Sequence, residues 1–253
     1  MLIAYASVGI FEMAVICNII SYLLGAMLLL RLPLAAKATN CDADAGPSGL
    51  RLLLRSRPFL GLIVVDAGFA ICSDALVVGL PISVKEASIG YVGVLGPLLA
   101  LNTFLIATTQ LFVAKAIRRT SRVRALVFAG LLWVTWAILV STLPVYSLAF
   151  SSVVLVLLVL LYCLAEMIHA PVANALAAEA APTDHRGVYF AAFQYGFAIA
   201  NIVVPAAFTA LFEVGHAVPW IALAVLAAAA TVGVSVVGRF LPAEAVRPVV
   251  VAQ

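Results

Sequence analysis

Long apolar segments separated by short polar ones make up most of this chain. The segments without any Asp, Glu, Lys or Arg are residues 13–30, 87–114, 125–165, 187–212 and 217–238. A further segment, 58–82, is interrupted only by Asp66 and Asp74. A helix crosses the hydrocarbon core of a bilayer with about 20 mostly apolar residues. The pattern therefore predicts membrane-spanning helices along most of the sequence.

The segment 125–165 is too long for one such helix, and the proline-containing stretch STLPVYS (141–147) divides it into two. The seven predicted spans are residues 2–30, 58–82, 90–114, 124–142, 147–178, 187–212 and 217–239. The fifth is longer than a core of about 30 Å requires. We expect that span to tilt or to project beyond the bilayer.

Composition supports the same fold class. Hydrophobic residues make up 66% of the chain and charged residues 10%, with a mean hydropathy of +1.22, whereas apolar residues are about half of a soluble domain. A soluble domain could not bury so many apolar faces. The sequence therefore predicts an all-α, polytopic membrane protein, in which one transmembrane helix precedes a bundle of six.

The basic residues are distributed unevenly among the predicted loops. The stretch AKAIRRTSRVRAL (114–126) alone contains five of the 14 Lys and Arg residues, and all 14 except Lys85 fall on one side of the predicted topology. An excess of Lys and Arg marks the cytoplasmic side. The amino terminus is therefore predicted outside and the carboxyl terminus in the cytoplasm. The basic stretch is chiefly a topology anchor, and it can also contact anionic lipid headgroups.

This topology divides the chain into four predicted parts: a first transmembrane helix (1–31), a cytoplasmic linker (32–57), the six-helix bundle (58–242) and a cytoplasmic tail (243–253). The middle of the linker, KATNCDADAGPSG, is small, polar and rich in turn formers. Its last part, GLRLLLRSRP, predicts a short interfacial helix. Because the chain starts inside a span, we expect it to be part of a longer protein.

Several functional classes are disfavoured by the residues themselves. A net charge of +3 is small for a nucleic-acid partner. The four cysteines are scattered and lack metal-ligand spacing, so neither a metal nor a cofactor is expected. The sequence has no HExxH, P-loop or nucleophile-elbow motif, and an enzyme is not expected.

Ionisable residues inside the spans are candidates for proton coupling, because such side chains usually face the bundle interior or an aqueous cavity. Asp66 and Asp74 are eight residues apart, which leaves them about 80° apart around a helix, so both can border one cavity. Glu166 and His169 lie on one helix face and form a candidate proton-handling pair. Glu12 in the first span is the fifth candidate. Polar contacts within the bundle are the alternative explanation for each.

Neutral polar side chains are candidates for the lining of a solute cavity. Gln194 and Asn201 are seven residues apart, so they form one polar stripe with Tyr195 beside it. Asn102 lies near the middle of the third span, and Gln110 follows eight residues later. Amides and aromatic rings of this kind suit an amphipathic solute, although hydrogen bonding between helices explains them equally well.

The basic stretch 114–126 resembles a loop pattern of the major facilitator superfamily, G-x-L-a-D-R-x-G-R-R. The basic residues Arg119, Arg122 and Arg124 match the pattern, whereas Arg118 occupies the position of the aspartate. The third predicted span, with its Asn-Thr pair and Gln110, is similar to the eighth helix of that family.

A second stretch, AEMIHAPVANALAAEAAPTDHRGVYFAAFQYGFAIANIVVPAAF (165–208), resembles the tenth and eleventh helices of drug-exporter-like members. Its Ala181, Pro182, Arg186 and Gly187 match an A-P-x-x-x-R-G ending, whereas valine precedes Pro205 where glycine is common. The resemblance covers essentially the whole chain. It implies spans six to twelve of a twelve-span transporter, with a facilitator-type six-helix bundle.

The resemblance implies proton-coupled efflux of a hydrophobic or drug-like small molecule across the plasma membrane. In that superfamily the cavity lies between two halves. The expected partners are therefore the lipid bilayer, the solute, protons, and a missing half or a second copy of the chain. A truncated chain that transports nothing, and a seven-helix receptor or scaffold, are the alternatives.

Overall fold

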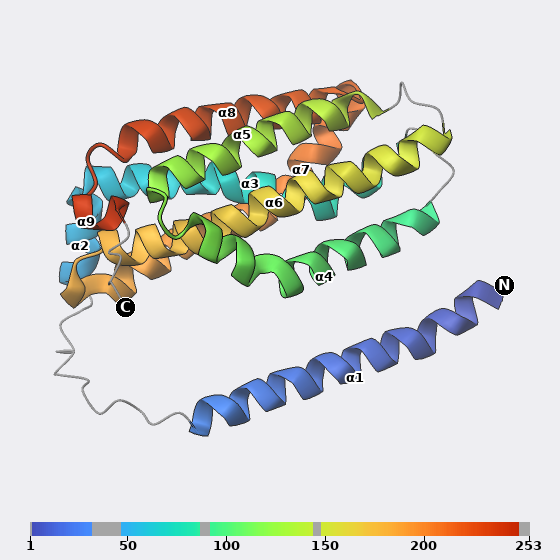
Figure 1. Cartoon of the computed structure of the whole chain (residues 1–253), viewed down its shortest axis with the longest axis horizontal. Coiled ribbons are helices and arrows are strands. Elements are labelled where there is room, and N and C mark those ends of the chain that lie inside the picture. The colour runs from blue at the N-terminus through green and yellow to red at the C-terminus, as the bar shows by residue number, and fades with distance from the viewer. Residues whose placement is uncertain (1, 32–46, 87–91, 144–147, 248–253) are drawn as a thin grey trace. The chain divides into compact units, whose positions relative to one another are not determined.

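The computed structural model describes residues 2–31, 47–86, 92–143 and 148–247, and all the regular elements within these ranges are helices (Figure 1). The chain divides into two units, Met1–Ala43 and Asp44–Gln253. The first unit contains α1 (Leu2–Arg31), a 30-residue apolar helix that ends in a basic residue. The predicted linker residues 32–46 and the tail residues 248–253 lie outside the described residues.

The second unit contains the predicted bundle. Its helices are α2 (Pro47–Arg55), α3 (Arg57–Glu86), α4 (Val92–Ile117), α5 (Arg122–Ser141), α6 (Leu148–Ala180), η3 (Thr183–His185), α7 (Arg186–Val214), α8 (Val218–Val237) and α9 (Ala243–Val246). Six helices of this unit are long and apolar enough to cross a membrane, and α1 includes a shorter apolar segment, Val15–Arg31. The prediction of a polytopic all-α membrane protein is thus confirmed, and each predicted span forms a helix.

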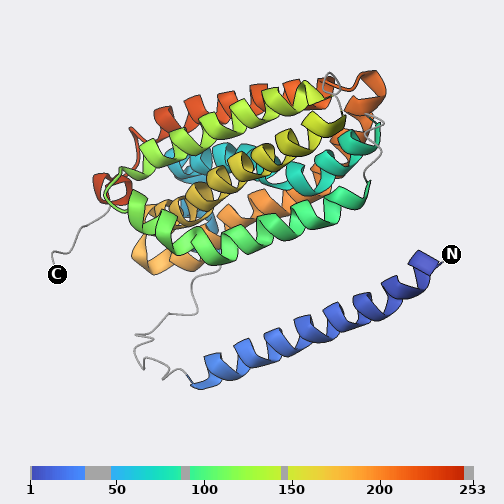
Figure 2. The ribbon, with the colours of Figure 1, turned by 45° about the vertical axis from the view of Figure 1, so that its right-hand side comes forward.

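The helices of the second unit form a bundle in which each long helix contacts two or more others. Helix α5 packs on α8 and α6, α3 packs on α7 and α8, and α4 packs mainly on α6 (Figures 1 and 2). The core between them contains the fully buried indoles of Trp133, Trp136 and Trp220. Trp136 meets Trp220 edge to face at 5.4 Å between ring centroids. These large rings fill the space where α5, α6 and α8 meet.

Small residues allow the helices to approach closely where no large side chain would fit. A Cβ atom at Gly130 of α5 would overlap the hydroxyl group of Thr231 on α8. A Cβ atom at Gly233 of α8 would lie 2.7 Å from a methyl group of Val65 on α3. Close approach through small residues is the usual way in which membrane helices gain van der Waals contact, since lipid supplies no hydrophobic driving force between them.

The basic stretch between α4 and α5 also has a structural role. The guanidinium of Arg122, at the start of α5, donates to both carboxylate oxygens of Glu179 at the end of α6, at 2.6 Å each. It also donates to the backbone carbonyl of Ala245 in α9 at 2.5 Å. A two-pronged contact between arginine and carboxylate is strong and directional. Arg122 therefore joins α5, α6 and α9 at this end of the bundle. The hydrophobic pattern of the sequence did not predict α9.

Gly130→Val is expected to lower the free energy of unfolding by about 1–3 kcal/mol, because the added methyl groups overpack the crossing of α5 and α8. The matched control is Gly96→Val, since a Cβ atom at Gly96 would meet nothing within 4 Å. The thermal midpoint of the purified protein in detergent measures the effect. Equal midpoints for the two variants would contradict this account of the crossing.

Candidate functional site

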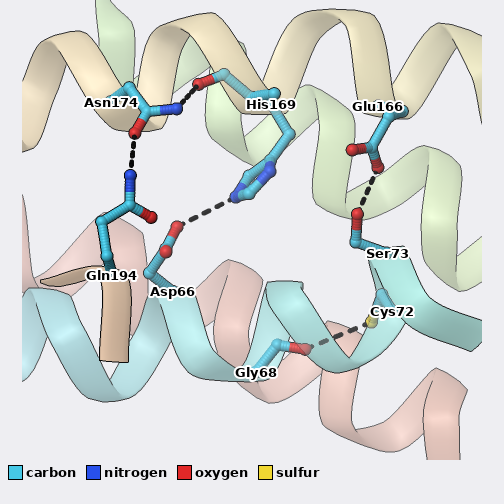
Figure 3. Close-up of polar contacts among 9 residues, drawn as sticks. Asp66, Gly68, Cys72, Ser73, Glu166, His169, Asn174 and Gln194 are labelled. Carbon is cyan, nitrogen blue, oxygen red and sulfur yellow. Dashed lines mark hydrogen bonds and ion pairs between the residues drawn. The ribbon is translucent and has the colours of Figure 1, made fainter. Parts of the chain in front are cut away.

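Helix α6 carries most of the polar contacts inside the bundle. Its side chains bond to groups on α3, α4, α5 and α7. In hydrocarbon an unpaired polar group costs several kcal/mol, so polar side chains at this depth must find partners within the protein. The candidate site is therefore built around α6, chiefly where it faces α3 (Figure 3).

Asp66 of α3 and His169 of α6 form a buried pair, in which the carboxylate Oδ1 lies 3.0 Å from the imidazole Nε2. Their exposed fractions are 2% and 0%. The rings of Phe69 and Trp133 lie 5.2 and 4.9 Å from the imidazole centroid and close the site on the side of α5. Asp66 Oδ2 and His169 Nδ1 are both buried, and neither has a hydrogen-bond partner among the described residues. Each member of the pair thus has one further atom that can form a hydrogen bond.

A second polar group lies along the same two helices. The hydroxyl of Ser73 on α3 donates to Glu166 Oε2 on α6 at 2.6 Å (Figure 3). The Tyr162 hydroxyl, one turn before Glu166, donates to the backbone carbonyl of Ser73 and lies 3.4 Å from the same carboxylate oxygen. The neighbouring Asp74 is half-buried, and its Oδ2 is buried without a hydrogen-bond partner in the described ranges. Two carboxylates therefore occupy this part of the interface between α3 and α6. We call this interface, with its residues Asp66, Ser73, Asp74, Glu166 and His169, the seam.

The predicted pairing of Glu166 with His169 is not what the structure shows. The two residues share a face of α6, as their spacing requires, but each reaches a different residue of α3. Their partners, Ser73 and Asp66, are seven residues apart on α3, so the two side chains of α6 diverge along that helix. The imidazole thus pairs with the carboxylate of another helix.

One of the predicted cavity residues of α4, Asn102, contacts α6. The Cys163 thiol donates to Asn102 Oδ1 at 2.9 Å, and the Thr109 hydroxyl lies 3.1 Å from the sulfur of Met167. Gln110 is half-buried. Asn102 therefore takes part in a hydrogen bond between α4 and α6, which is the alternative to a cavity role given above.

The predicted polar stripe of α7 lies on an exposed face of the unit. Gln194 donates to Asn174 of α6 at 3.4 Å, whereas Asn201 donates to the backbone carbonyl of Phe197 in its own helix. Tyr195 is 67% exposed. These side chains are available to a solute or to another chain, while those of the seam are turned inward.

The remaining predicted residues are exposed. Glu12 is exposed on α1, in the other unit. The predicted loop residues Arg119, Arg124, Arg186 and Gly187 are exposed in the second unit.

Sequence reasoning missed Ser73 and Tyr162, which hold Glu166 in place. A signal was present for both, because Ser73 precedes Asp74 and Tyr162 lies one helical turn before Glu166. It also missed Trp133, whose contact with His169 depends on how α5 packs beside α6. Spacing along one helix cannot reveal such a contact between helices.

The chemistry of the seam is that of carboxylates in an apolar setting. Within the described ranges, no Lys or Arg pairs with Asp66, Asp74 or Glu166, and no three His, Cys, Asp or Glu side chains gather as a metal site. A carboxylate without a basic partner in hydrocarbon is stable when it is protonated or when it binds a cation. The seam is thus suited to binding protons or cationic groups.

Comparison with known proteins identifies the family. A search of curated proteins finds no match. The family model described as Major Facilitator Superfamily matches residues 1–205, which is most of the chain. Together with the six spans of the second unit, this match confirms the resemblance to the superfamily. The chain belongs to the major facilitator superfamily and is an integral membrane protein of the secondary transporter class.

Proposed function

We propose that the protein exports a hydrophobic or drug-like small molecule in exchange for protons. The observation that supports this is the seam between α3 and α6, where three carboxylates lie in an apolar bundle. Asp66 pairs there with His169, whereas Asp74 and Glu166 have no basic partner among the described residues. A carboxylate in such a place is a functional candidate by default. When a carboxylate of the seam binds a proton, the interior of the bundle contains one negative charge fewer.

In the proposed mechanism the proton acts on the contacts between two helices. When Glu166 is ionised, it accepts the hydrogen bond from Ser73 at 2.6 Å. Protonation turns one carboxylate oxygen into a donor and removes the charge, so the bond is weakened or rearranged. Alternatively the proton resides on Asp74, whose Oδ2 is unpartnered in the described structure, and Glu166 then stays ionised. A proton therefore changes the relative stability of two arrangements of α3 and α6, which is what coupling requires.

The proposed solute site lies on the face formed by α4 and α7. Gln194, Tyr195 and Asn201 are exposed there on α7, and Gln110 is half-exposed on α4. The same two helices also carry exposed apolar side chains, including Phe104 on α4 and Ile199 on α7. An apolar surface with a few amides and one phenol suits a hydrophobic solute with few polar groups.

A single wall of this kind does not enclose a solute, so we propose that a second bundle completes the cavity. The second wall comes from a second copy of the chain or from a separate half. The proposed setting is the plasma membrane, with the amino terminus outside and the carboxyl terminus in the cytoplasm. The distribution of Lys and Arg among the loops supports this orientation.

Glu166→Gln and Asp74→Asn are each expected to reduce transport driven by a pH gradient by at least tenfold, because the amide cannot exchange a proton. The measurement is efflux of a lipophilic fluorescent dye from proteoliposomes with an imposed pH gradient. Matched controls are Glu213→Gln and Asp184→Asn, since both carboxylates are exposed and lie outside the seam. If both seam variants transported the dye at the rate of the controls, proton coupling at this site would be refuted.

His169→Leu is expected to lower the free energy of unfolding by about 3–5 kcal/mol, because it leaves the buried Asp66 carboxylate without a partner. Asp66→Leu with His169→Leu is expected to regain most of that loss, since apolar residues can replace a buried pair at little cost. Thermal unfolding in detergent compares the variants.

The folded double variant also tests the role of the pair in coupling. We expect it to lose transport driven by the pH gradient while it still binds the dye. If the double variant transported the dye at the wild-type rate, the Asp66–His169 pair would have a structural role only.

A further inference from the structure

A small cavity lies at the end of the second unit that carries the basic stretch, away from the seam. It has a volume of about 170 Å³, several times the roughly 30 Å³ that one water molecule occupies in the liquid. Its walls come from the last turns of α4 and from α6 beside Pro171. It is therefore separate from the carboxylates and amides assigned to transport.

The residues that line this cavity are apolar apart from one threonine and two arginines. The apolar walls are formed by Ala114, Ile117, Val172 and Ala175, together with Pro171. Thr120, Arg118 and Arg122 complete the lining. Such a lining suits a molecule that is anionic at one end and apolar at the other.

The two arginines differ in how their charges are balanced. Arg122 is neutralised by Glu179, with which it shares two hydrogen bonds of 2.6 Å. Arg118 is exposed, and no carboxylate pairs with it in the part of the chain that the structure describes. One uncompensated positive charge thus stands at the edge of an apolar cavity. A single phosphodiester carries the complementary charge.

We propose that this cavity binds an anionic phospholipid, with Arg118 on the phosphate and the apolar walls against the glycerol and the first acyl carbons. Charge complementarity requires an anion, and guanidinium is well suited to phosphate. The apolar walls favour a lipid over free phosphate, because an inorganic ion would leave most of its oxygens without donors. The basic end of a membrane-spanning bundle lies at the level of the headgroups, where anionic lipid is available.

The site differs from a diffuse attraction between a basic loop and a charged surface. A diffuse attraction depends on net charge, so the removal of any one arginine weakens it equally. Lipid binding at a defined site depends instead on Arg118 and on the empty volume beside it. Arg119 and Arg124 are exposed but do not line the cavity, so they provide controls with the same change in charge.

The test is lipid retention by the purified full chain, measured by native mass spectrometry after titration with phosphatidylglycerol or phosphatidylcholine in detergent. The variants are Arg118→Gln, the matched control Arg119→Gln, and Ala175→Leu, which fills the cavity without any change in charge. Ala114→Leu fills it from the other helix and serves if Ala175→Leu does not fold. Circular dichroism checks folding, and inorganic phosphate is the competitor in a further arm.

We expect the wild type and Arg119→Gln to retain phosphatidylglycerol in preference to phosphatidylcholine. Arg118→Gln and the filled-cavity variant are expected to bind phosphatidylglycerol about tenfold more weakly, because each loses a charged hydrogen bond or the space for the ligand. Equal losses in Arg118→Gln and Arg119→Gln would overturn the proposal in favour of diffuse attraction. Full retention by the filled-cavity variant, or displacement of the lipid by millimolar phosphate, would overturn it as well.

Discussion

The polar groups of α6 must be satisfied inside the bundle, because hydrocarbon offers neither donors nor acceptors. This requirement fixes how α6 sits against its neighbours. His169 bonds to Asp66 and Glu166 bonds to Ser73, so two contacts at different depths set the register of α6 on α3. Cys163 does the same for α4. At the end with the basic stretch, Glu179 ties α6 to α5 through Arg122. Together these contacts determine the position of the candidate site.

The other helix pairs are held in a different way. Helices α5 and α8 cross closely at Gly130 and Thr231, and α3 packs on α7, where a Cβ atom at Gly196 would meet Ala67 at 3.4 Å. Contacts of this kind involve no ionisable side chain. The seam between α3 and α6 contains three carboxylates instead, and it is there that we propose the proton binds. The fold thus separates the close helix crossings from the proposed proton site.

The positions of the helices could be predicted well from the sequence. Helix α6 spans 33 residues, in line with the over-long fifth span, and α2 occupies the stretch predicted as interfacial. Helix α9, with only four residues, has no hydrophobic period to reveal it. The candidate site was predicted in part, because the spacing of Asp66, Glu166 and His169 placed them on helices but left their partners open. Ser73 and Trp133 were missed, since their roles depend on contacts between helices that are far apart in sequence.

The sequence by itself determined the fold class, the helical spans and the family, because each depends on local hydrophobicity or on motifs that are continuous in the chain. Only the tertiary structure decided that His169 pairs with Asp66 rather than with Glu166, and that Arg122 is neutralised while Arg118 is free of any described carboxylate. Helical periodicity gives the direction of a side chain around its own axis. It does not give the rotation and depth of the neighbouring helix, and these set which polar atoms meet.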